Sequence, residues 1–197
     1  MRPDPILLAF DTSAAHCAAA LLCAGKIHTR IDEMARGQAE HLMPMLEEVL
    51  AAHGLAWRDL DAIGVGTGPG NFTGIRISVA AARGLALGLG IPAVGVSNFD
   101  AAAYGLPRPV DVLIPAPRDQ AYSQRLTGNG GETPMLLAPH DPRPDPAIPL
   151  QPAERMIAHI ARIAAERFET VSARPAPLYV RAADAAPSRD APPVILP

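Results

Sequence analysis

The chain has 197 residues, of which 49% are hydrophobic and 19% are charged, and its formal net charge is −3 at pH 7. That length suits one domain or two small ones with a buried core, and the mildly acidic balance argues against a basic face that grips nucleic-acid phosphates. No apolar run approaches the roughly 20 residues of a membrane span, and the first residues lack the layout of a signal peptide, so we expect a cytoplasmic protein.

Proline and glycine divide the chain into two unlike halves. Residues 1–100 hold five of the 22 prolines and twelve of the 16 glycines, whereas residues 101–197 hold seventeen prolines and four glycines. This split excludes a uniform fold. We expect an N-terminal α/β lobe over 1–104, a shortened second lobe over 105–182 and a tail over 183–197.

The first half alternates between strand and helix patterns. Apolar runs bounded by tight turns predict strands over 6–11, 16–23, 26–31, 61–66 and 93–96. Apolar residues at helical spacing predict a helix over 38–53, in which Pro44 marks a kink or the start of the regular part, and a second helix over 74–89. This order predicts an α/β layer with a mixed sheet.

The second half is less regular. Strands are predicted over 110–114, 120–126 and 133–138, with Gly130-Gly131 as a hairpin turn. Six prolines in 139–152 exclude a helix or a central strand there and predict a loop. Pro152 suits the opening of a helix predicted over 153–168.

Cysteine and histidine spacing offers no local metal site. Cys17 and Cys23 would share one face of a strand about 20 Å apart, which is too far for a disulfide, so we expect two free thiols. The six histidines form no H-x-x-x-H or H-E-x-x-H pair.

Two motifs at strand ends are candidates for binding chemistry. Asp11-Thr12-Ser13 could orient a metal ion or meet a phosphate, or could serve as turn residues. The run from Gly66 to Gly74 could offer backbone N–H groups to an anion at a helix start, or could need glycine for close packing. It matches neither a P-loop nor a Rossmann fingerprint. The candidate ligand-binding residues are Asp11, Thr12, Ser13, Gly68 and Gly70.

The predicted helix 74–89 is apolar nearly all round and rich in alanine and glycine. Such a helix must be covered on both sides, either by the chain itself or by a partner. We expect it to form a helical subunit interface with the helix 38–53, with ordinary core packing as the alternative. The candidate partner-binding residues are His41, Leu42, Met45, Leu46, Val49, Arg76, Val79, Ala82 and Arg83.

Several runs together resemble one family. They are Ile6–Ser13, Glu40–Pro44, the Gly-Pro-Gly-x-Phe-Thr-Gly-x-Arg run within Gly66–Ile77, Ala82–Ala86, Ile91–Ser97 and Pro177–Arg181. The chain resembles the TsaB (YeaZ) family, the bacterial accessory proteins of tRNA threonylcarbamoyladenosine (t6A) biosynthesis. The resemblance is dense over 6–100 and thin over 105–197.

The resemblance implies a two-lobed α/β fold of the actin/sugar-kinase/heat-shock-ATPase type, in which Asp11-Thr12-Ser13 lies at the phosphate-contacting turn. It implies a non-catalytic scaffold that pairs with the TsaD-type transferase through its N-terminal helices, with a TsaE-type ATPase recruited by the pair. tRNA would be contacted only indirectly, and the isolated protein would form a homodimer. No cofactor would be required, with ATP or ADP and Mg²⁺ at a complex interface as the alternative.

Two departures bear on function, one from the catalytic TsaD-like members and one from the members of the family in general. TsaD-like proteins carry a G-V-N-H-x-x-x-H stretch that supplies two histidines to a metal, and the same places here hold Asn98 and Ala102. We therefore expect no metal. A D-A-R-R type segment is replaced by Pro115-Ala116-Pro117-Arg118, which removes an acid that could face a nucleotide.

Two enzyme hypotheses stand beside the scaffold. One is a small-molecule kinase or ATPase that uses Asp11 and the Gly66–Gly74 loop. The other is a glycoprotease, the older label of the wider family, which needs the metal site that residues 95–102 do not supply.

Overall fold

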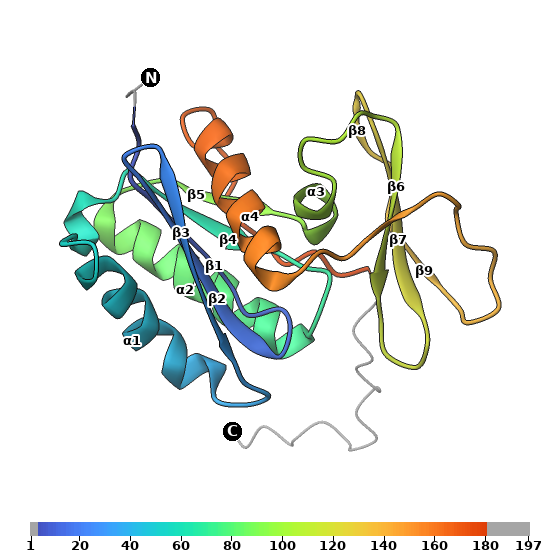
Figure 1. The fold of residues 1–197 in the computed structure, drawn as a ribbon, viewed down its shortest axis with the longest axis horizontal. Coiled ribbons are helices and arrows are strands. Elements are labelled where there is room, and N and C mark those ends of the chain that lie inside the picture. The colour runs from blue at the N-terminus through green and yellow to red at the C-terminus, as the bar shows by residue number, and fades with distance from the viewer. Residues whose placement is uncertain (1–3, 181–197) are drawn as a thin grey trace, which may run out of the picture.

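Two five-stranded sheets organise residues 4–180, the part of the chain that the computed structural model describes (Figure 1). The first sheet has the order β3-β2-β1-β4-β5. Its antiparallel half joins β1, β2 and β3, and its parallel half joins β1, β4 and β5. All five predicted strands are confirmed, as Leu7–Asp11 (β1), His16–Cys23 (β2), Lys26–Glu33 (β3), Ala62–Gly66 (β4) and Ala93–Val96 (β5).

Helices α1 (Gln38–Ala51) and α2 (Phe72–Leu89) cover one face of this sheet. Side chains alternate along β1, so Leu8 and Phe10 pack under these helices while Leu7 and Ala9 point to the other face. Pro44 lies inside α1, as predicted. Asn71 caps α2, because its Oδ1 accepts from the backbone N–H of Gly74 at 2.9 Å, and the helix therefore begins two residues before the predicted start.

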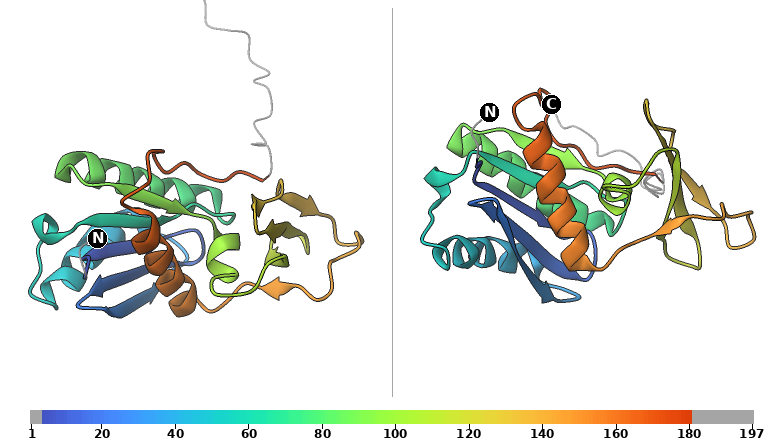
Figure 2. Two further views of the ribbon diagram at one scale, coloured as in Figure 1. Left: turned by 90° about the horizontal axis from the view of Figure 1, so that it is seen from above. Right: turned by 45° about the horizontal axis from the view of Figure 1, so that its top comes forward.

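Helix α4 (Ala153–Arg167) covers the opposite face of the first sheet (Figures 1 and 2). The approach to β4 is close, since a Cβ added at Gly64 would lie 2.9 Å from the Cβ of Ala164. The sequence assigns this helix to the second lobe, yet it packs on β1, β2 and β4. The division at 104/105 stays a prediction, and the predicted tail 183–197 lies outside the described residues.

The second sheet has the order β10-β6-β7-β8, with β9 also paired to β7. Its three predicted strands are confirmed, and Gly130–Gly131 (β8) folds back on the end of β7 as a hairpin. The proline-rich stretch contributes a two-residue edge strand parallel to β6, which agrees with the exclusion of a central strand. The bounds are Val110–Pro115 (β6), Ala121–Thr127 (β7), Met135–Leu137 (β9) and Ile148–Pro149 (β10).

Two short helices were not predicted, a 3-10 turn at Trp57–Asp59 (η1) and α3 at Asn98–Ala102. Ser97 caps α3, because its Oγ accepts from the backbone N–H of Asp100 at 3.0 Å. Both cysteines are free thiols, as expected.

Helix α2 departs from the expectation that no segment approaches a membrane span. Among the described residues it is the one helix long and apolar enough to cross a membrane, with 18 residues and a mean hydropathy of 1.3. Its inner side is buried against the first sheet through Ile75, Val79 and Ala82. In this structure it is therefore a layer helix of the α/β fold.

Candidate functional site

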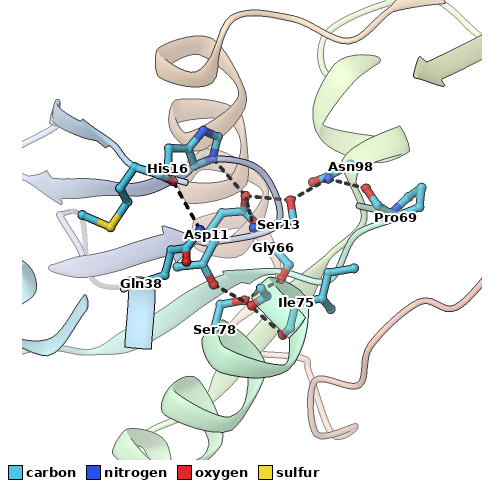
Figure 3. Close-up of polar contacts among 12 residues, drawn as sticks. Asp11, Ser13, His16, Gln38, Gly66, Pro69, Ile75, Ser78 and Asn98 are labelled. Carbon is cyan, nitrogen blue, oxygen red and sulfur yellow. Dashed lines mark hydrogen bonds and ion pairs between the residues drawn. The ribbon is translucent and has the colours of Figure 1, made fainter. Parts of the chain in front are cut away.

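The Asp11-Thr12-Ser13 turn lies at the carboxyl end of β1, where the chain turns toward β2 (Figure 3). All three residues are buried. Asp11 Oδ2 accepts from the backbone N–H and the Oγ of Ser13, at 3.1 and 2.8 Å. Thr12 Oγ1 donates to the carbonyl of Gly74 at 2.6 Å. These bonds fix the turn internally.

The glycine-rich loop after β4 packs directly onto this turn. A Cβ on Gly66 would overlap Asp11 Oδ1, one on Gly70 would overlap the Ser13 carbonyl, and one on Gly74 would overlap the Thr12 carbonyl. Gly68 has φ +89°, a left-handed conformation that favours glycine. Close packing therefore accounts for the glycines.

Backbone donors at the start of α2 are already engaged. The N–H of Asn71 donates to the Ser13 carbonyl at 2.7 Å, and the N–H of Gly74 donates to the side chain of Asn71. The loop therefore does not present these two groups to a phosphate.

Asn98 ties the turn to the loop. Its Nδ2 donates to Ser13 Oγ at 3.1 Å and to the Pro69 carbonyl at 2.9 Å, and its backbone N–H donates to the Gly68 carbonyl at 2.7 Å (Figure 3). Ala102, at the other histidine place, is buried in the core. Within residues 4–180 no group of three His, Cys, Asp or Glu side chains could hold a metal ion.

A cavity of about 630 Å³ opens beside the turn, between the first sheet and the second. Asp11, Ser13 and Asn98 line it on the turn side, and α4 lines it with Met156, Ile157 and Ile160. Pro115 and Pro117, at the end of β6 and in the turn toward β7, also line it. The structure thus brings Asp11, Ser13 and Gly70 of the predicted binding residues to one cavity, while Thr12 and Gly68 pack behind them.

The donor set of this cavity does not fit a nucleotide. Among residues 4–180, no lysine or arginine lines it, and Asp11 is the one acidic side chain in its wall. His16 and Tyr122 are the other titratable side chains in the wall, and His16 Nε2 lies 3.4 Å from Asp11 Oδ2. A phosphate chain needs cations or free N–H donors, so nucleotide binding at this turn stays a prediction that the geometry disfavours.

The predicted partner-binding residues fall on two sides of the α1/α2 layer. Leu42, Met45, Leu46, Val49, Val79 and Ala82 are at most 7% exposed and pack against the first sheet. In this structure the apolar stripe of each helix faces the core of the same chain, and a role of these six residues in a partner contact stays a prediction. His41 is half-buried, and Arg76 and Arg83 are exposed.

We call the exposed side of these helices the outer face. On α2 it comprises Arg76, Ala80, Arg83, Gly84, Leu87 and Gly88, and on α1 it comprises Glu40, Pro44, Glu47, Glu48 and Ala51. Leu87, near the end of α2, is 81% exposed, and sequence reasoning missed it. The signal was its position, eleven residues after Arg76 and four after Arg83 on one helical side.

The last described segment returns to the start of α2. Arg76 stacks on Phe72, with its guanidinium carbon 3.7 Å from the ring centroid, and its Nε donates to the hydroxyl of Tyr179 at 2.8 Å. The backbone N–H of Leu178 donates to the Thr67 carbonyl. Leu178 and Tyr179 therefore hold the last described segment against the glycine loop and α2.

An ion-pair network joins β3 to α1 at the rim of the outer face. Arg30 binds Asp32 at 2.9 Å and Glu48 at 2.7 Å, and His41 Nε2 lies 2.7 Å from Asp32 Oδ2. The hydrogen bond from Arg30 lowers the pKa of Asp32, and the hydrogen bond from His41 lowers it further. Burial acts in the opposite direction but does not cancel these effects. Nearby, burial and the charges of Asp32 and Asp11 raise the pKa of the Cys17 thiol to about 11, which keeps it protonated.

Comparisons with known proteins agree on one relationship. The family model of TsaD, tRNA N6-adenosine threonylcarbamoyltransferase, matches residues 27–136. An uncharacterized protein of Mycobacterium tuberculosis (strain ATCC 25618 / H37Rv) is 34% identical over 173 residues, covering 80% of this chain and 82% of that protein. The tRNA threonylcarbamoyladenosine biosynthesis protein TsaB of Haemophilus influenzae is 44% identical over 98 residues. A crystal structure from Pseudomonas aeruginosa, of an uncharacterized protein with similarity to peptidase YEAZ, matches with a TM-score of 0.71 and 28% identity, over 90% of this chain and 100% of that chain.

This chain belongs to the TsaB (YeaZ) family. The expected two-lobed α/β fold of the actin/sugar-kinase/heat-shock-ATPase type is confirmed by its two sheets and by the YeaZ structures. The match to the H. influenzae TsaB covers 49% of this chain and 41% of that protein, which is less than half of the relative's length.

Proposed function

We propose that this chain is a non-catalytic scaffold subunit of the t6A machinery, and that it pairs with a TsaD-type threonylcarbamoyl transferase. Its relatives in H. influenzae and E. coli are named tRNA threonylcarbamoyladenosine biosynthesis proteins. In this proposal a TsaE-type ATPase joins through the pair, tRNA is contacted only through the complex, and the chain requires no cofactor of its own.

The observation that carries the pairing is the outer face. Leu87 is 81% exposed, and nothing lies within 4 Å of a Cβ added at Gly84 or Gly88. Glycines inside a helix lower its stability, so two of them beside an exposed leucine are favourable only if they let another helix approach closely. A partner helix that packs over Leu87 would supply that compensation.

Charge on the outer face supports association with a complementary helical pair. Helix α1 carries three glutamates and no lysine or arginine, whereas α2 carries two arginines and no acid. A two-fold contact between copies would place the acidic α1 of one over the basic α2 of the other. The isolated chain is accordingly a homodimer in this proposal, on the surface that the transferase takes in the complex.

The non-catalytic assignment is supported by the state of the glycine loop. The alternative, a kinase or ATPase that uses Asp11 and the Gly66–Gly74 loop, needs backbone amides for phosphate. The amides of Asn71 and Gly74 bond to the chain itself. Steady-state ATP hydrolysis by the isolated chain, lost in Asp11→Ala, would establish the alternative instead.

The test is co-purification of the full chain with the TsaD-type protein of the same organism, together with t6A levels after deletion. Arg83→Glu and Leu87→Glu lie on the outer face and should abolish both association and complementation while the thermal midpoint stays unchanged. Arg162→Glu is the control matched to Arg83→Glu. It makes the same charge change at an exposed position of α4, on the opposite face of the sheet. Normal association of both outer-face variants, or intact t6A in the deletion strain, would overturn the proposal.

A further inference from the structure

The cavity beside the Asp11 turn combines an apolar wall with one carboxylate, and the proposed scaffold role gives this combination no function. Its volume of about 630 Å³ lies within the range of small-molecule sites. Four residues of α4 and Ile114 of β6 form an apolar wall, and Tyr122 adds an aromatic ring. Such a wall would bury the body of an organic molecule.

Asp11 gives this apolar space one fixed negative charge. Its side chain is 8% exposed. Within residues 4–180, Asp11 Oδ1 is the one buried side-chain oxygen or nitrogen that has no hydrogen-bond partner. A buried carboxylate oxygen without a hydrogen-bond donor is unfavourable, because folding removes its hydrogen bonds to water and no protein group replaces them.

Within residues 4–180, no lysine or arginine lines the cavity, and the one basic side chain that lines it is His16, whose Nε2 lies 3.4 Å from Asp11 Oδ2, longer than a good hydrogen bond. Ser13 donates its two bonds to Oδ2 and none to Oδ1. Oδ1 lies against Gly66, whereas Oδ2 is held by Ser13 and His16, which both line the cavity, so Oδ2 is the oxygen that a ligand in the cavity would meet.

We infer that this cavity binds a small organic cation, a molecule with an apolar or aromatic body and an ammonium head. The head donates to Asp11 and supplies the missing positive charge, and the body lies against Met156, Ile157 and Ile160. Anions are excluded, because the same carboxylate repels them without any cation in the wall. This ligand class goes beyond the scaffold function and does not depend on it.

The test is isothermal titration calorimetry of the full chain with three probes. They are 2-phenylethylamine, which is an ammonium ion at pH 7, its acidic counterpart 3-phenylpropanoate, and ADP with Mg²⁺. We expect saturable binding of the amine, at least about tenfold tighter than the acid, and no binding of ADP. A shifted methyl signal of Met156 in the methionine NMR spectrum should accompany the amine alone.

Variants locate the binding in the cavity. Asp11→Asn keeps the shape and an acceptor for Ser13 and should weaken the amine about tenfold or more. Met156→Trp fills the apolar wall, leaves the turn intact and should abolish binding. Glu154→Gln is the control, because it removes a carboxylate from the same helix outside the cavity and should change nothing.

Three outcomes would overturn the inference. They are no saturable binding of the amine, equal or tighter binding of 3-phenylpropanoate or ADP, and amine binding that survives Met156→Trp. If Asp11→Asn fails to fold, the comparison between the amine and its acid on the unmodified chain still decides the role of charge.

Discussion

The buried and exposed sides of the α1/α2 layer contain the same residue types, but these residues have different roles on the two sides. On the buried side, where β4 leads through the glycine loop into α2, a Cβ at Gly66, Gly70 or Gly74 would overlap atoms of the Asp11 turn. On the outer face, Gly84 and Gly88 have nothing within 4 Å of such a Cβ. The packing of this chain requires glycine at the first three positions but not at Gly84 and Gly88. Close contact with another molecule would explain glycine at these two positions.

The same contrast holds for the large side chains. Leu46 is 0% exposed on the inner face and Leu87 is 81% exposed on the outer face. A stripe of apolar residues marks the side that packs on the sheet, so hydrophobicity alone identifies the core and not the interface. Substitutions on the two faces should therefore separate folding from association.

The largest effect is expected from Leu46→Glu. This change places a carboxylate in the core between α1 and the first sheet, where no cation can pair with it, and the chain should lose its cooperative unfolding transition. Far-UV circular dichroism during a urea titration measures this. Glu47→Gln, one residue along on the outer face, is the control and should retain the wild-type transition. A folded, monomeric Leu46→Glu would reassign this residue to an interface.

Gly74→Ala should lower the free energy of unfolding by about 3 kcal/mol. Its Cβ would meet the backbone carbonyl of Thr12, which cannot move without disturbing β1. The midpoint of chemical denaturation reports the change. A loss below about 0.5 kcal/mol would mean that the loop relaxes freely, and that its glycines serve something other than packing.

Gly84→Ala should act in the opposite direction on folding. An alanine in the open middle of α2 should raise the free energy of unfolding by up to about 1 kcal/mol, because alanine is the better helix former. The added methyl should weaken self-association and transferase binding, as sedimentation equilibrium can measure. Stabilisation with unchanged association would show that Gly84 is not a contact point.

The smallest effect is expected at the rim, from Arg30→Gln. Arg30 is the main cause of the lowered pKa of Asp32. A carboxylate whose pKa is lowered by folding stabilises the folded state at pH values above its unfolded-state pKa. That stabilisation disappears as the pH falls through the folded pKa. Wild type should exceed the variant by about 0.5–1 kcal/mol at pH 7, since the pair is partly exposed.

The difference should shrink toward zero as the pH falls through the lowered folded pKa of Asp32, because Asp32 is then protonated in both the folded and the unfolded state. The double variant with Asp32→Asn should show no such pH dependence. A constant difference across the whole pH range would assign the loss to packing of the Arg30 side chain.

Local pattern was enough to predict the strands and long helices of the first half. Alternation along β1 and β2 and the helical stripe of α1 each depend on residues close in sequence. Helix α3 was missed because five residues carry no period, although Ser97 followed by Asp100 three residues later is a recognisable cap.

The site was harder to predict than the elements. The sequence predicted Asp11, Ser13 and Gly70 as binding residues, and all three line the same cavity. It could not tell that the loop amides are already bonded, because that depends on how closely loop and turn approach. Nor could it place α4, since the apolar stripe of a helix does not say which sheet it covers.

The position of α4 also has a consequence for synthesis on the ribosome. All five strands of the first sheet lie before residue 97, but Ala153–Arg167 cover the face that bears Leu7 and Ala9. During translation that face stays bare while roughly 70 further residues are added, which takes about 4–14 seconds at bacterial elongation rates. The nascent chain therefore carries a completed but half-covered sheet through the tunnel exit, and a stop codon anywhere before α4 would leave a product that exposes its own core.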